Sequence, residues 1–156
     1  MKNLFIALAA SLALAAPAQA AASDPLMVPI HQFMDGFNTG NEKSALAAFA
    51  PAVSIIDDIP PHVWTGPDAM TAWVKDLTAA ESKAKITGGK VTIGIPTREI
   101  SDGSRAYVVV PTVYHFLDHG KPMHDAATMT FALQKISGKW LIAGWSWNGS
   151  VPKPGK

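Results

Sequence analysis

The stretch RAYVVVPTVYHFLD, residues 105–118, is rich in the β-branched and aromatic side chains that favour β-strands. Two further stretches of this kind follow it along the chain, MHDAATMTFALQKI at residues 123–136 and KWLIAGWSWN at residues 139–148. A fourth stretch precedes it and alternates apolar with polar residues from about Lys90. Short turn-forming sequences separate the four stretches: Ser101-Asp102-Gly103, His119-Gly120 and Ser137-Gly138. This pattern predicts four long strands that are joined by three turns into an antiparallel meander.

The N-terminal half of the chain has helical rather than strand-like spacing. After the helix-starting pair Asp24-Pro25, apolar residues recur at helical intervals: Leu26, Ile30, Phe33, Met34 and Phe37. Gly40 ends this helix, Asn41 caps a second short one, and Pro67 begins a third. A short β-branched strand at residues 53–57 and a loop at residues 58–66 lie between the second and third helices. Because helices come first and strands follow, we predict an α+β fold.

Length, charge and cysteine content exclude several classes of function. The 156 residues fit one domain, and a net charge of +1 without a cluster of Lys and Arg does not support a nucleic-acid partner. The absence of cysteine excludes disulfides, a thiolate nucleophile and a cysteine-ligated metal. His115, His119 and His124 cluster around one predicted turn, but their spacing matches no familiar zinc motif. We therefore predict neither a metal nor another cofactor.

The first twenty residues have the features of a secretory signal peptide. A lysine precedes an apolar segment at residues 4–16, and Ala18-Gln19-Ala20 matches the small-residue cleavage pattern. The apolar segment is shorter than the ~20 residues that a membrane-spanning helix needs. We therefore predict a signal peptide over residues 1–20, a folded domain over residues 21–150 and a flexible tail over residues 151–156. The mature protein is expected to be periplasmic or secreted, with no membrane partner.

Three segments carry a resemblance to a known fold: FNTGN at residues 37–41, GPDAM at residues 66–70 and the closing stretch at residues 138–147. Together with the order of the predicted elements over residues 24–149, they resemble the nuclear transport factor 2-like superfamily, which includes ketosteroid isomerase and the SnoaL-like proteins. The resemblance implies a cone-shaped curved antiparallel sheet that packs on three N-terminal helices and encloses an apolar cavity. It also implies a small apolar ligand and a homodimer.

The turn at His119-Gly120 determines which side chains share a face of the predicted sheet. If Asp118 pairs with Lys121, one mostly apolar face carries three opposed pairs: Tyr114 with Asp125, Val110 with Met129, and Val108 with Phe131. This face is expected to meet the helices and to line the cavity.

We predict six ligand-cavity residues: Phe33, Trp73, Val110, Met129, Phe131 and Trp147. The sequence leaves two alternatives for the face on which the last strand places its tryptophans. A regular register from Ser137-Gly138 places Trp145 and Trp147 on the outer face of the sheet. A single bulge, or the resemblance, places them on the cavity wall instead.

Asp57 is the main candidate for a catalytic residue. It ends the short apolar strand at residues 53–57, and the resemblance places the proton-shuttling carboxylate of ketosteroid isomerase at this position. A carboxylate beside an apolar pocket has a raised pKa, which suits it to proton transfer near neutral pH. The alternative is that Asp57 only caps the loop that follows it.

An isomerase of this type also needs hydrogen-bond donors that stabilise an oxyanion. The resemblance places Phe33, which has no donor, where ketosteroid isomerase has a tyrosine. It places the isomerase's protonated aspartic acid at His124 or Asp125, and the strand face favours Asp125. Tyr114, predicted to lie opposite Asp125, is a second candidate donor. The predicted catalytic set is therefore Asp57, Tyr114 and Asp125.

These residues support two main hypotheses of function. The first is cofactor-independent acid/base catalysis of the isomerase, cyclase or dehydratase type on an apolar small molecule, which Asp57 favours. The second is a non-catalytic periplasmic ligand-binding or accessory protein, which Phe33 favours. A third hypothesis, epoxide hydrolysis, needs an Asp–Arg–Asp set, and Arg98 and Arg105 are the only arginines in the chain.

Overall fold

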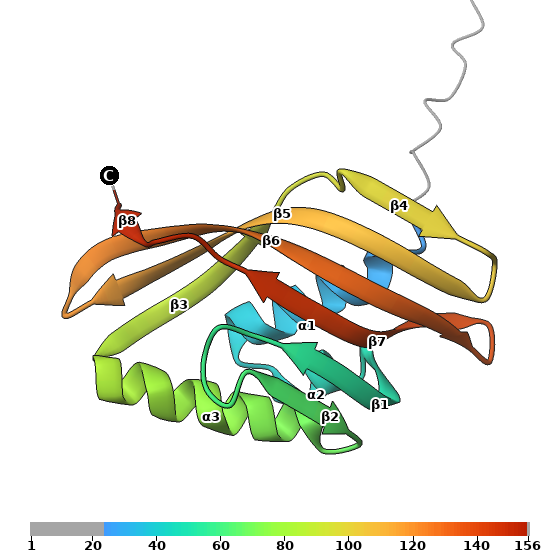
Figure 1. Cartoon of the computed structure of the whole chain (residues 1–156), viewed down its shortest axis with the longest axis horizontal. Coiled ribbons are helices and arrows are strands. Elements are labelled where there is room, and N and C mark those ends of the chain that lie inside the picture. Colours follow the sequence, from blue (N-terminus) through green and yellow to red (C-terminus); the bar gives the residue numbers. More distant parts are fainter. Residues whose placement is uncertain (1–23, 156) are drawn as a thin grey trace, which may run out of the picture.

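Three helices and eight strands make up residues 24–155, the part of the chain that the computed structural model describes (Figure 1). The helices are α1 (Met27–Thr39), α2 (Glu42–Leu46) and α3 (Ala69–Ala84). None of these three helices is long and apolar enough to span a membrane. The predicted signal peptide, residues 1–20, lies outside the described residues.

The strands form one curved, mixed sheet. They are β1 (Phe49–Ile56), β2 (Val63–Gly66), β3 (Ile86–Ile93), β4 (Arg98–Ser101), β5 (Arg105–Asp118), β6 (Lys121–Ile136), β7 (Lys139–Asn148) and β8 (Lys153–Pro154). Their order is β2-β1-β7-β6-β5-β3, with β4 pairing with β5 and β8 pairing with β6. Figure 1 shows the long strands arching across one side of the molecule and the helices lying on the other.

The α+β fold class is confirmed, with one difference in the sheet. β1 runs parallel to β7, with Ile55 opposite Trp145, whereas the sheet was expected to be antiparallel. β1 and β7 are separated in the sequence by β2, α3 and the meander. No tight turn therefore constrains these two strands to antiparallel pairing.

The β5–β6 hairpin has the register predicted from its turn. Asp118 pairs with Lys121, and the expected pairs follow along the strands: Tyr114–Asp125, Val110–Met129 and Val108–Phe131. This face of the hairpin carries side chains with no exposed surface, including Val108, Val110 and Phe131. The predicted face is therefore the one that meets the helices.

A bulge in the β6–β7 pairing decides the position of the last two tryptophans. Ala132 lies opposite Gly144, but the next pair joins Leu133 to Ile142, so that β7 contains one extra residue at this point. Beyond the bulge, Trp145 lies opposite Phe131 and Trp147 opposite Met129. The two tryptophans are thus on the inner face, and the open alternative is resolved in favour of the cavity wall.

Local sequence explains how α1 and α2 pack together. α1 ends at Gly40, whose φ of 69° is accessible to glycine, and the Asn41 Oδ1 accepts a hydrogen bond from the Ser44 N at 3.1 Å to start α2. Gly36 lies against α2 so closely that a Cβ on it would come within 2.6 Å of the Ala45 N. The sharp turn and the close contact direct α1 across the concave face of the sheet.

β2 lies inside a segment that was predicted to be a loop, residues 58–66. The backbone turns back after β1 and is closed by a hydrogen bond of 3.1 Å from the Asp57 N to the His62 O. Val63–Gly66 then pairs antiparallel with β1. The turn fixes the position of Asp57 directly after the end of β1.

Two further segments differ from the sequence-based expectation. The strand expected from Lys90 starts earlier, at Ile86, and is divided into β3 and β4 by residues 94–97. The segment expected to be a flexible tail, residues 151–156, includes β8, whose Lys153 pairs with His124. β4 and β8 have weak sequence signals, because all four residues of β4 are in exposed positions and β8 is only two residues long.

Candidate functional site

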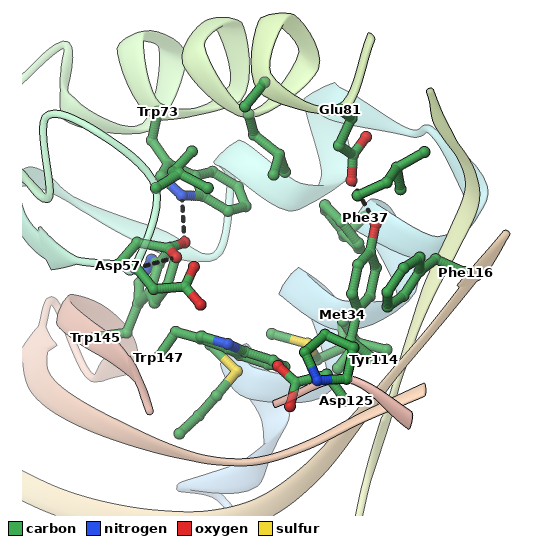
Figure 2. Close-up of a pocket in the computed structure, with 18 of the residues that line it drawn as sticks. Met34, Phe37, Asp57, Trp73, Glu81, Tyr114, Phe116, Asp125, Trp145 and Trp147 are labelled. Carbon is green, nitrogen blue, oxygen red and sulfur yellow. Dashed lines mark hydrogen bonds between the residues drawn. The ribbon is translucent and has the colours of Figure 1, made fainter. Parts of the chain in front are cut away.

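A cavity of about 290 Å³ lies between α1, α3 and the concave face of the sheet (Figure 2). Its wall is mostly apolar and aromatic. The aromatic lining residues are Phe33, Phe37, Trp73, Tyr114, Phe116, Trp145 and Trp147. The titratable groups on the wall, apart from Tyr114, are Asp57, Asp58, Glu81 and Asp125. A small number of polar groups in an apolar hollow is typical of a site for a small molecule.

Asp57 lines this cavity directly after the end of β1 and is only 9% exposed. The Trp73 Nε1 donates to its Oδ2 at 2.7 Å, and the Asp58 N donates to its Oδ1 at 2.6 Å. The carboxylate therefore lines the cavity and also caps the start of the following loop, so both features proposed for Asp57 from the sequence are present. Each oxygen of a carboxylate has two lone pairs, so these two N–H donors do not use all the acceptor positions. The Asp58 carboxyl also lies within hydrogen-bonding range of the Asp57 carboxyl.

The surroundings of Asp57 raise its pKa from 3.8 to about 6. Burial is the largest cause, because an apolar wall disfavours the charged form. The neighbouring Asp58 carboxyl raises the pKa further, while the hydrogen bond from Trp73 lowers it. A carboxyl with this pKa is ionised in most molecules at pH 7 and binds a proton more readily than an exposed aspartate.

Tyr114 is held by Glu81, a residue that was not among the predicted site residues. Its hydroxyl donates a hydrogen bond to Glu81 Oε1, which joins β5 to α3 across the cavity. Burial, together with the negative charge of Glu81, raises the pKa of Tyr114 above its ordinary value. Glu81 lies eight residues after Trp73 and four after Leu77, so helical periodicity places it on the same face of α3. This spacing is the sequence feature from which a position of Glu81 near the cavity could have been predicted.

Asp125 lies on β6 opposite Tyr114, as predicted, and is 6% exposed. Its Oδ1 accepts hydrogen bonds from the Ser150 N at 2.7 Å and from the Ser150 Oγ at 2.9 Å. Asp125 therefore attaches the segment after β7 to the sheet. The side chain also lines the cavity, near the labelled Tyr114 in Figure 2.

The six predicted ligand-cavity residues divide into two groups. Phe33, Trp73, Met129 and Trp147 line the cavity. Val110 and Phe131 share the inner face but lie in the hydrophobic core with no exposed surface, and they are not among the lining residues. The strand face was enough to place both side chains inside the molecule, but not to distinguish the core from the cavity wall.

Two alternatives weighed on the sequence find no support in the geometry. Within residues 24–155, no group of three or more His, Asp or Glu side chains is arranged to bind a metal ion. His119 instead contacts the adjacent Asp118 at 2.6 Å on the surface. Arg98 and Arg105 are exposed and neither lines the cavity, which contradicts the Asp–Arg–Asp set of an epoxide hydrolase.

Comparison with known proteins identifies one family for this chain and many solved structures that share its fold. The model of the family described as "SnoaL-like domain" matches residues 29–154. No curated protein matches the sequence at a significant level.

Solved structures with this fold come from proteins of different kinds. One is a ketosteroid isomerase-like protein from Erwinia carotovora atroseptica SCRI1043, with 14% identity over 82% of this chain and 95% of that chain and a TM-score of 0.63. Another is the hexachlorocyclohexane dehydrochlorinase LinA-type3 from Novosphingobium barchaimii LL02, with 9% identity over 83% and 87% and a TM-score of 0.70. A third, from Nostoc punctiforme, is a protein of unknown function with 12% identity over 81% and 90% and a TM-score of 0.62. At these identities the likeness shows a shared fold alone.

Proposed function

The chain belongs to the SnoaL-like domain family. From the residues that line its cavity, we propose that it binds an apolar small molecule there and that Asp57 acts on this molecule as a general base. The fold is shared with an isomerase-like protein and a dehydrochlorinase, both named for reactions on small molecules, and with proteins of unknown function. Family and fold do not select the reaction. The residues of the cavity carry the proposal.

The observation that carries it is the position of the Asp57 carboxylate. It is buried on an apolar wall, its pKa is raised to about 6, and each of its oxygens is oriented by a single N–H donor. A base with a pKa near the working pH combines a large ionised fraction with a useful affinity for the proton. Trp73 fixes the geometry of the carboxylate and so reduces the cost of aligning it with a ligand.

The proposed step is a proton transfer at carbon. Asp57 takes a proton from a C–H bond next to an activating group, the electron pair is delocalised into that group, and the proton returns to the same or a conjugated carbon. The net result is hydrogen exchange or isomerisation. The step uses only the side chains of this chain and requires no redox cofactor or metal.

Hydrogen–deuterium exchange on 2-tetralone tests this proposal. This bicyclic ketone has acidic C–H bonds and an apolar frame, and its exchange in D2O is followed by NMR. We expect the protein to accelerate exchange and Asp57→Asn to abolish the acceleration. Asp68→Asn is the matched control, because Asp68 is exposed at the start of α3 and makes no capping hydrogen bond. Acceleration that persists in Asp57→Asn would disprove the assignment of the base.

A non-catalytic binding protein is the second candidate, and the donor groups favour it. Phe33 has no hydrogen-bond donor, the Tyr114 hydroxyl donates to Glu81, and the Asp125 carboxylate accepts from Ser150. A developing oxyanion thus has no evident partner among these three residues. Saturable ligand binding without any exchange in the tetralone experiment would select this candidate.

Export and dimerisation complete the proposal. We propose that the signal sequence at residues 1–20 directs the protein to the periplasm or the medium, and that the mature chain is a homodimer. N-terminal sequencing of protein from the producing cell should begin at Ala21, and light scattering should give twice the mass of the mature chain. An uncleaved N-terminus would contradict the first proposal, and a monomer mass would contradict the second.

A further inference from the structure

The charged groups on the cavity wall all have the same sign. Asp57, Asp58, Glu81 and Asp125 line the cavity, and the described residues of this wall include no Lys, Arg or His. The four acidic residues come from the end of β1, from α3 and from β6. Figure 2 shows Asp57 across the cavity from Glu81. A bound molecule is therefore within reach of acidic groups on more than one wall.

Aromatic rings cover the space between these acidic groups. The rings of Trp73 and Trp145 meet edge to face with centroids 4.9 Å apart. The Tyr114 ring stacks on Phe116 at 5.1 Å and is nearly perpendicular to Trp147 at 6.4 Å. Rings in several orientations present both faces and edges to the cavity. The face of an aromatic ring, and of an indole above all, attracts a cation.

The hydrogen bonds already made leave more acceptors than donors for a ligand, because the Trp147 N–H is the one indole donor that remains on the described part of the wall. The Trp73 N–H is donated to Asp57 and the Tyr114 hydroxyl to Glu81. The Trp145 N–H is buried and has no partner among the described residues, so it does not reach the cavity surface. The free lone pairs belong to carboxylates and to the Tyr114 oxygen. These groups match a ligand that donates hydrogen bonds.

The charge of the ligand follows from these three observations. An anion would be repelled by several carboxylates in a site of low dielectric constant. A neutral molecule, such as the ketone of the exchange experiment, should bind more weakly than a cation with the same frame, because it displaces water from the carboxylates without neutralising them. We infer that the cavity binds an apolar organic cation, such as a protonated amine on a hydrophobic frame. The inference rests on the binding part of the proposed function and is independent of proton transfer to Asp57.

A cationic ligand also changes what catalysis would require. If Asp57 takes a C–H proton next to an iminium group, the C–H bond breaks and an O–H bond forms on Asp57. The electron pair becomes the C=C bond of a neutral enamine as the nitrogen takes back its own pair. No negative charge develops on the substrate, so the reaction needs no oxyanion donor at the position of Phe33.

Three ligands with one frame test the inference: 4-phenylbutylammonium, 4-phenylbutan-1-ol and 4-phenylbutyrate. Their affinities are measured by calorimetry at pH 7.5, with tryptophan fluorescence as a second readout, since Trp73 and Trp147 line the cavity. The ammonium should bind about tenfold more tightly than the alcohol, and the carboxylate should bind most weakly. An alcohol or carboxylate that equals the ammonium would overturn the cation inference and leave the cavity proposal intact. If none of the three binds at millimolar concentrations, both are contradicted.

The variant Glu81→Gln tests whether the preference for the ammonium over the alcohol arises from a carboxylate of the cavity wall. Glutamine keeps the side-chain length and an oxygen that accepts the Tyr114 hydroxyl, but it removes the charge. The ratio of ammonium to alcohol affinity should fall about threefold to tenfold in this variant, with little change in alcohol binding. Glu42→Gln is the matched control, because Glu42 is exposed on α2 and does not line the cavity. Equal ratios in the two variants would show that Glu81 does not contact the cation.

Discussion

At the scale of single residues, the pKa of the Asp57 carboxyl is determined by the groups that surround it in the folded protein. A buried carboxylate is costly unless hydrogen bonds satisfy it. Trp73 and the Asp58 N supply one hydrogen bond to each oxygen, while burial keeps the pKa near 6. Near neutral pH the Asp57 carboxyl is therefore protonated in a larger fraction of molecules than the carboxyl of an exposed aspartate.

This raised pKa predicts how stability depends on pH. The folded-state pKa of about 6 exceeds the ordinary value of 3.8, so the native state binds the proton more tightly than the unfolded chain. The stabilisation is complete below pH 4 and is lost as the pH rises through 6. Between pH 4 and pH 7, the free energy of unfolding of the wild type should fall by about 1–3 kcal/mol relative to Asp57→Asn.

Urea unfolding at several pH values measures this difference. In Asp68→Asn, which alters an exposed aspartate, the difference from the wild type should stay nearly constant with pH. A constant difference for Asp57→Asn as well would mean that Asp57 has an ordinary pKa in the folded protein.

Trp73→Phe should raise the pKa of Asp57 above 6, because the indole N–H stabilises the ionised carboxylate. The midpoint of the Asp57 carboxyl ¹³C titration by NMR measures this effect. Trp64→Phe is the matched control. It removes an equivalent bond of 2.9 Å, from the Trp64 Nε1 to the Asp76 Oδ2, away from the cavity. Equal shifts of the Asp57 midpoint in both variants would show that the effect is not specific to Trp73.

The sequence predicts some of these residues and misses others for physical reasons. Asp57 is found because it ends a short apolar strand, and Trp73 because it lies on the apolar face of a helix. Glu81 is missed because a charged residue on a helix is normally solvated. Its role as the acceptor for Tyr114 depends on how α3 approaches β5, which sequence spacing alone does not determine.

At the scale of elements, local pairing is predictable and distant pairing is not. The β5–β6 register follows from the turn at His119-Gly120, because a tight turn fixes every later pair. The parallel pairing of β1 with β7 joins segments that are distant in the sequence. The bulge between Ala132 and Leu133 has no sequence signature of its own, yet it places Trp145 and Trp147 on the inner face.

Gly89→Ala tests how β3 positions Tyr114. A Cβ on Gly89 would overlap the hydroxyl and ring of Tyr114, so the ring must move and its hydrogen bond to Glu81 is disturbed. We expect a loss of about 1–3 kcal/mol in the free energy of unfolding. In a Tyr114→Leu background the same substitution should cost much less. An equal cost in both backgrounds would show that the close contact is with another group.

At the scale of the whole molecule, α1, α3 and the concave face of the sheet together enclose the cavity. The order of helices and strands predicts the α+β class, the turn at His119-Gly120 predicts the inner face of the hairpin, and the resemblance to a known fold implies the cavity. The sequence does not predict where the core stops and the cavity starts. Val110 and Phe131 are buried in the core, whereas Met129, on the same face, lines the cavity.

A general base with a pKa near 6 in this cavity is the central feature of the proposed function. The pH dependence of deuterium exchange into 2-tetralone tests it most directly. After subtraction of the uncatalysed rate, kcat/KM should rise with pH, with an inflection near 6, and then level off. The inflection should be absent in Asp57→Asn. A profile with its inflection near 4, or one that is the same in the wild type and Asp57→Asn, would contradict the account.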